Sequence, residues 1–237
     1  RITGPVTLAP GHTLTLGETV VRVFEPTGSA AGGVGRGTTI APLDAGRRTS
    51  IDQVAEMVSA DAWQPQRDAG TLTILFSDIE SSTERVSRVG DAAWFELLEL
   101  HNHVFREELA RAGGREIKSQ GDGFMLTFPS VRRALSFATA VQRRLTEHSA
   151  ADPEREIRVR MGLHTGEVIT DASGDLFGRH VNKAARIANL AAGGQILTSG
   201  TVREIASGDH DVEFAAGTEV SLKGLDGTHV VHEVVWS

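Results

Sequence analysis

The chain has 237 residues, of which 40% are hydrophobic and 23% charged, a composition typical of a globular protein with one good-sized domain and a smaller appendage. Its net charge of −7 argues against a nucleic-acid-binding or anionic-membrane surface, because such surfaces need a basic footprint, so no nucleic-acid partner is expected. The sequence contains no cysteine, which excludes disulfides, a thiolate nucleophile and Cys-ligated zinc, and fits a reducing, cytoplasmic location.

No membrane segment is predicted, because no apolar run approaches the roughly 20 residues that a spanning helix needs. A signal-peptide pattern is also absent. The chain begins at Arg1 rather than Met, so we expect a longer parent protein in which a regulatory domain could lie upstream.

The first quarter of the chain predicts a small β-element followed by a linker. Residues 1–25 contain two alternating apolar runs, at 13–16 and 20–24, which predict a β-hairpin. This hairpin resembles the last two strands of a forkhead-associated domain, a phosphothreonine-reading β-sandwich; an unrelated β-arm is the alternative. Residues 26–68 are interpreted as a linker that is rich in Gly, Ala and Pro and contains a short helix at 50–60.

From residue 69 to residue 237 the hydrophobic pattern predicts regularly spaced strands and helices. The core order, β-α-β-β-α-β, is that of a ferredoxin-like split βαβ unit, an α+β fold. We expect the helices on one face of the sheet, which would leave the other face free for a partner. The predicted strands lie at 71–77, 115–120, 123–128, 157–163 and 195–198, and the predicted helices at 82–89, 91–113 (with Asp91 as N-cap), 130–148, 179–191 and 201–206, before a terminal β-region.

Two aspartates lie at the ends of predicted strands. Asp78 follows the apolar run from Leu72 to Phe76, and Asp122 lies in a Gly-Asp-Gly turn between two strands. Carboxylates at the ends of adjacent strands can converge on a hard cation such as Mg²⁺, which prefers oxygen ligands and phosphate partners. Because strand-end aspartates are also common turn formers, the pair alone is weak evidence for a metal site.

Other charged and polar residues accompany this pair. Asn182 and Arg186 are i and i+4 on one predicted helix, so they share a face. Lys118 lies four positions before the second aspartate, Asp175 precedes the helix that carries Asn182, and Lys223 lies in a late turn.

Five segments in order resemble the motifs of class III adenylyl/guanylyl cyclase catalytic domains: FSDIESST, KSQGDG, IRVRMGLHTGEV, DLFGRHVNKAARI and LKGLDG. The resemblance identifies residues 69–237 as the catalytic domain. It implies an enzyme that cyclises a nucleoside triphosphate to a 3′,5′-cyclic nucleotide and pyrophosphate.

The resemblance implies a role for each residue of the site. Asp78, Asp122 and the backbone carbonyl of Ile79 would hold two Mg²⁺ or Mn²⁺ ions, which activate the ribose 3′-hydroxyl and neutralise the triphosphate. Asn182 would orient the ribose, and Arg186 would stabilise the charge on the pentavalent α-phosphorus.

Substrate choice follows from hydrogen-bonding capacity. Lys118 can only donate and ionised Asp175 can only accept, which matches N1 and N6 of adenine and mismatches guanine at both positions. By resemblance, Lys223 would contact the β- and γ-phosphates. ATP is therefore the expected substrate, and a guanylyl cyclase is the alternative.

In this family the metal aspartates come from one protomer, whereas the base-reading and the Asn/Arg pairs come from the other. The presence of all of them in one chain implies a homodimer with two equivalent composite sites. One departure is Ser81, where the family usually has Gly, a residue that permits unusual φ and close backbone approach. We expect reduced or altered activity from it, and it is the one feature that favours a catalytically silent nucleotide-sensing or dimerisation module.

Overall fold

The computed structural model describes residues 13–16, 19–22, 50–51, 68–151, 155–171, 174–208 and 211–236. The chain forms two units, residues 1–45 and residues 46–237. In the first unit, β1 (Thr13–Leu16) and β2 (Thr19–Arg22) pair as an antiparallel hairpin where the alternating runs predict one. Its relation to a forkhead-associated domain stays a prediction.

Of the predicted helix at 50–60, the described residues are Ser50 and Ile51, both helical, and the rest of that prediction lies outside the described residues. The Ile51 side chain is fully buried in the second unit.

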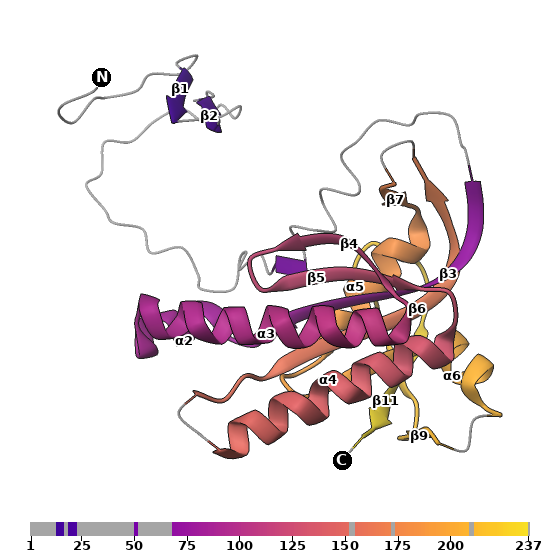
Figure 1. Ribbon diagram of the computed structural model, residues 1–237. Helices are drawn as coiled ribbons and strands as arrows, with labels where there is room; N and C mark the ends of the chain where they lie inside the picture. Colours follow the sequence, from indigo (N-terminus) through magenta and orange to yellow (C-terminus); the bar gives the residue numbers. More distant parts are fainter. Residues whose placement is uncertain are drawn as a thin grey trace, which may run out of the picture. The chain divides into compact units, whose positions relative to one another are not determined.

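The second unit is built on one large mixed sheet with the strand order β10-β11-β8-β6-β3-β5-β4 (Figure 1). The two longest strands, β3 and β6, pair antiparallel along their whole length. The order β6-β3-β5-β4, with helices between β3 and β4 and between β5 and β6, confirms the predicted ferredoxin-like α+β core. These strands are β3 (Asp68–Ile79), β4 (Arg115–Gln120), β5 (Gly123–Phe128) and β6 (Val159–Thr170).

Further strands widen the sheet beyond β6. β8 pairs parallel to β6, and β11 pairs antiparallel to β8. The short β7 pairs with β6, and the short β9 and β10 pair with β11. Their bounds are β7 (Leu176–Phe177), β8 (Ile196–Ser199), β9 (Glu213–Phe214), β10 (Thr218–Val220) and β11 (His229–Val235).

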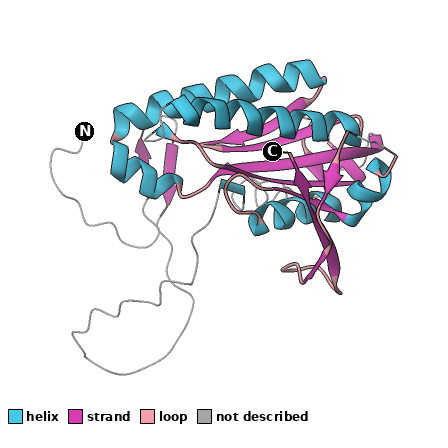
Figure 2. Ribbon diagram, turned by 90° about the horizontal axis from the view of Figure 1, so that it is seen from below, coloured by secondary structure: helices cyan, strands magenta, loops and turns pink. Residues whose placement is uncertain are grey.

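Helices cover both faces of the sheet, so the expectation of helices on one face is wrong (Figure 2). On one face α3, α4 and α6 pack with Leu75 and Ile79 of β3; on the other face α5 packs with Ile74 and Phe76. The physical reason is that these strands are apolar on both sides, and a strand buried on both faces needs cover on both. The helices are α2 (Ser82–Val89), α3 (Asp91–Ala112), α4 (Val131–Ala151), α5 (Arg179–Leu190) and α6 (Gly200–Ala206).

The junction between α2 and α3 differs from the prediction by one residue. Gly90, rather than Asp91, is the N-cap of α3, and its φ of 81° suits a glycine. Its backbone N–H also closes α2 by donating to the carbonyl of Val86. One glycine therefore ends the first helix and starts the second.

Within the described parts of the chain, no helix combines the length and the apolar character needed to span a bilayer.

Helix α5 lies directly against the backbone of β6. A Cβ at Gly162 of β6 would lie only 2.1 Å from the backbone nitrogen of Ala188 in α5. Because backbone atoms cannot move aside as a flexible side chain can, this contact requires glycine.

We predict that Gly162→Ala lowers the free energy of unfolding by about 2 kcal/mol, because α5 must move away from the sheet. Urea titration followed by circular dichroism measures this loss. Gly70→Ala in β3 is the matched control, since a Cβ there meets no atom within 4 Å. Equal effects of the two substitutions would contradict the close approach of α5 to β6.

Candidate active site

The predicted metal aspartates lie close together at one end of β3. Asp78 is the penultimate residue of β3, and Asp122 lies in the turn between β4 and β5. The neighbouring pair Ser77 and Phe124 is the last of the β3–β5 register, which brings this turn beside the end of β3. Both aspartates are buried, with 4% and 6% of their surface exposed.

Each aspartate has one oxygen bound by a neighbouring residue. Arg160, opposite Asp78 in the β3–β6 register, donates from Nε to Asp78 Oδ2 at 3.2 Å and forms an ion pair with it through Nη2. Ser50 Oγ donates to Asp122 Oδ1 at 2.7 Å. Among the described residues, the other oxygens, Asp78 Oδ1 and Asp122 Oδ2, are buried without a hydrogen-bond partner.

The electrostatics of this pair favour a cation. Burial and the neighbouring charge of Asp122 raise the pKa of Asp78 to about 6, although Arg160 and Ser50 act in the opposite direction. Two unpartnered carboxylate oxygens in a buried position are the ligands that a hard divalent ion prefers. The residues present therefore fit a metal site.

The described residues contain no group of three or more His, Asp or Glu side chains that could hold a metal. A cation here would need oxygen from outside the side chains, such as a backbone carbonyl or a substrate phosphate. Ile79 ends β3 directly after Asp78, with its side chain in the core. Its carbonyl as a third ligand stays a prediction.

The predicted base-reading residues also come together. Lys118 of β4 forms an ion pair with Asp175 Oδ2, and the two side chains are 19% and 11% exposed. The other oxygen, Asp175 Oδ1, accepts from the backbone N–H of Leu176 at 3.0 Å. The backbone N–H of Leu176 thus holds the carboxylate in one orientation while the other oxygen faces the lysine.

The remaining predicted residues lie on other elements. Asn182 and Arg186 are partly exposed on α5, and Lys223 is exposed in the turn between β10 and β11. Their roles toward a nucleotide stay predictions.

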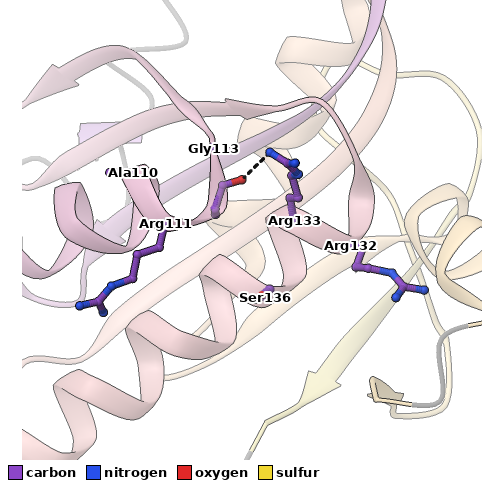
Figure 3. Close-up of a pocket in the computed structure, with 7 residues that line it drawn as sticks. Ala110, Arg111, Gly113, Arg132, Arg133 and Ser136 are labelled. Carbon is purple, nitrogen blue, oxygen red and sulfur yellow. Dashed lines mark hydrogen bonds between the residues drawn. The ribbon is translucent and has the colours of Figure 1, made fainter.

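A pocket of about 300 Å³ opens beside Asp122, and its lining includes Ser82, Thr83 and Trp94 from α2 and α3. A separate pocket of about 510 Å³ lies between the end of α3 and the start of α4 (Figure 3). There Arg133 donates to the carbonyl of Ala112 at 3.4 Å, and none of the predicted site residues lines it. Of these two pockets, the one beside Asp122 adjoins the candidate site.

Sequence reasoning missed the immediate partners of the aspartates, Arg160 and Ser50. The alternation of Arg158 and Arg160 with apolar residues at the start of β6 indicates a half-polar strand, but not which residue lies opposite Asp78. It also missed that His164 and His180 hydrogen-bond to one another, at 2.8 Å between Nε2 and Nδ1.

The sequence of residues 65–234 matches the family described as "Adenylate and Guanylate cyclase catalytic domain". The chain therefore belongs to this family, which confirms the resemblance drawn from the five motifs. The match begins after the N-terminal hairpin, so it does not bear on the forkhead-associated resemblance.

Two curated relatives are both named "Adenylate cyclase". The one from Neurospora crassa is 36% identical over 153 residues, which are 55% of this chain and 7% of the relative. The one from Mycosarcoma maydis is 35% identical over 153 residues, which are 55% of this chain and 6% of the relative. The chain thus spans only a small part of the length of these relatives.

Among solved structures, the guanylyl cyclase Cya2 superposes with a TM-score of 0.63 at 24% identity, over 72% of this chain and 94% of that chain. At this level of identity the likeness concerns the fold, which is that of a nucleotidyl cyclase domain.

The pKa of Asp78 gives a prediction for metal-free buffer. Since the folded-state value of about 6 exceeds the ordinary 3.8, the folded protein binds this proton more tightly than the unfolded chain does. The contribution of Asp78 to stability is then fully present below pH 3.8 and lost as pH rises through about 6. We predict that the unfolding free energy of the wild type, relative to Asp78→Asn, falls by about 2 kcal/mol between pH 4 and pH 7.

Chemical denaturation of both proteins in the presence of a chelator measures this difference, and the comparison cancels the titration of groups that do not interact with Asp78. A difference that stays constant, or that grows with pH, would contradict the buried carboxylate pair.

Proposed function

We propose that the chain is an adenylyl cyclase, which converts ATP to 3′,5′-cyclic AMP and pyrophosphate. The observation that carries this proposal is the buried pair of Asp78 and Asp122, each with one oxygen that lacks a partner among the described residues. The names of the two relatives at 36% and 35% identity support the same activity.

The proposed reaction needs no protein nucleophile. The ribose O3′ loses its proton and bonds to the α-phosphorus, while the bond from that phosphorus to the bridging oxygen breaks and releases pyrophosphate. Two Mg²⁺ or Mn²⁺ ions, when bound, would lower the pKa of the 3′-hydroxyl and neutralise the triphosphate. Asp78 and Asp122 would hold these ions, with help from the Ile79 carbonyl.

The other residues bind and orient the substrate. Asn182 would position the ribose, and Arg186 would stabilise the charge on the α-phosphorus as it becomes five-coordinate. Lys223, exposed in its turn, would reach the β- and γ-phosphates. We assign these residues to a composite site, completed by a second copy of the chain in a homodimer.

The ion pair of Lys118 and Asp175 supports adenine as the base. Lys118 would donate to N1, and Asp175 would accept from the N6 amine. The two groups are paired with each other and largely buried, so the lysine donor and the carboxylate acceptor lie side by side. An adenine edge would replace their mutual contact with one hydrogen bond to each group. Guanine would face a donor with its N1–H and an acceptor with its O6, and it would leave both groups unsatisfied.

A catalytically silent domain is the second candidate, and the conformation of Ser81 favours it. Ser81 has φ 55° and ψ 36°, the left-handed region that costs a residue other than glycine roughly 1–2 kcal/mol. It lies between α2 and residues 78–80, the segment that we call the metal loop, and such strain could displace that segment. The retained aspartates and the paired Lys118 and Asp175 favour the active enzyme.

We predict that the purified chain with Mn²⁺ turns over ATP at least about tenfold faster than GTP, because guanine mismatches the Lys118–Asp175 pair. Lys118→Ala should lower kcat/KM for ATP by about tenfold to a hundredfold, the loss expected for a hydrogen bond to a charged group. Chromatographic separation of cyclic AMP, cyclic GMP and pyrophosphate measures all of these products.

Faster turnover of GTP would overturn the assignment of the base-reading pair. Binding of ATP without turnover would favour the silent domain. In that case Ser81→Gly tests the cause, since it removes the backbone strain without adding a functional group.

A further inference from the structure

Three residues bind one another between the metal loop and the turn that follows α5. Glu80, directly after Ile79, accepts through Oε1 from the backbone N–H of Gly193 at 2.7 Å. Its Oε2 lies 3.3 Å from Arg158 Nη1, and Arg158 Nη2 donates to the carbonyl of Gly193 at 2.8 Å. The backbone N–H of Glu80 donates to the carbonyl of Arg158 at 2.9 Å. Each member of this Glu80–Arg158–Gly193 clamp thus binds both others.

The clamp requires glycine at its third position. A Cβ on Gly193 would lie 2.6 Å from Glu80 Oε2 and 2.8 Å from Arg158 Cβ. The φ of Gly193 is not positive, so glycine is required here for space rather than for an unusual backbone conformation. The carboxylate and the turn are therefore in direct contact, with no room for a side chain between them.

The same turn is fastened to the sheet on its other side. Gly194 donates its N–H to the carbonyl of Val159 at 2.8 Å, and Met161 donates to the carbonyl of Gln195 at 3.0 Å. The turn begins where α5 ends, after Leu190. A displacement of the metal loop would consequently reach the C-terminal end of α5 through Glu80.

Stability alone does not explain this arrangement. The side chains of Glu80 and Arg158 are 33% and 48% exposed, and ion pairs at such exposed positions contribute little to folding. What the clamp does fix is the geometry between two elements of the proposed site, the end of β3 that carries Asp78 and the helix α5 that carries Arg186.

We propose that Glu80 is a positioning residue that sets the metal loop and α5 relative to each other through Arg158 and Gly193. This inference rests on the proposed function. In a composite dimer, the Asp78 of one protomer serves one active site while the Arg186 of the same protomer serves the other. The clamp therefore connects the two active sites of the dimer within each chain.

Mixed dimers test the inference by leaving one intact site. An Asp78→Ala chain combined with an Arg186→Ala chain contains one complete site, with Asp78 from the second chain and Arg186 from the first. Glu80→Ala is then placed either in the chain that supplies Asp78 or in the chain that supplies Arg186. ATP turnover is measured at several Mn²⁺ concentrations.

We expect Glu80→Ala to lower kcat by about tenfold in either placement, because small misplacements of catalytic groups are costly. The Mn²⁺ concentration for half-maximal activity should rise only when the substitution lies in the chain that supplies Asp78. A merely local role predicts no effect in the chain that supplies Arg186, and that result would overturn the inference.

Three further variants separate positioning from general damage. Glu80→Gln keeps an oxygen for the N–H of Gly193 and should restore activity to a level between that of Glu80→Ala and that of the wild type. Gly193→Ala places a Cβ against the Glu80 carboxylate, which disturbs the same contact, and should reproduce the pattern of Glu80→Ala. Glu96→Ala breaks an exposed ion pair to Arg155, 2.7 Å long, and should leave activity unchanged.

The mixture of Asp78→Ala and Arg186→Ala chains with Glu80 intact separates a failure of the proposed function from a failure of the proposed role of Glu80. No activity in that mixture contradicts the composite site of the proposed function. Restored activity that is insensitive to Glu80→Ala in the chain supplying Arg186 contradicts the clamp alone. Thermal unfolding of each mixed dimer confirms that the variants are folded.

Discussion

The repulsion between two buried carboxylates at the end of β3 is the constraint on which the rest of the site depends. Like charges withdrawn from water raise the free energy of the fold unless they are compensated. Here Arg160 binds one oxygen of Asp78, and Ser50 binds one oxygen of Asp122. Among the described residues, the other oxygen of each aspartate has no hydrogen-bond partner. The two unpartnered oxygens fit a divalent cation, and we propose the pair as a metal site rather than as a structural ion pair.

The sheet carries this pair because its central strands are covered on both faces. Helix α5 approaches the backbone of β6 so closely that Gly162 has no room for a side chain, and the turn after α5 contacts Glu80 of the metal loop. The elements that would bind metal and those that would bind the ribose and α-phosphate therefore belong to one continuously packed body. In the proposed dimer these elements would serve different sites, so that packing within one chain would couple the two sites.

Much of this arrangement could be predicted from the sequence. Hydrophobic periodicity located the helices and strands of the core, and placement at strand ends predicted that Asp78 and Asp122 lie together. The pairing of Lys118 with Asp175 came instead from the resemblance to the cyclase motifs. The cover on both faces could also have been predicted from the consecutive apolar residues Ile74, Leu75 and Phe76 of β3, because successive strand residues point to opposite faces. The ion pair of Asp78 with Arg160 could not be predicted from the sequence. It depends on the register between strands some 80 residues apart, and a local pattern does not specify that register.

The most direct measurement is Mn²⁺ binding to the chain in the presence of 3′-deoxy-ATP, which lacks the attacking hydroxyl and cannot cyclise. Titration followed by electron paramagnetic resonance counts the bound ions. The account predicts saturable binding that is lost in both Asp78→Asn and Asp122→Asn but retained in Glu96→Gln. Unchanged Mn²⁺ binding in either aspartate variant would contradict the claim that this buried carboxylate pair is the metal site.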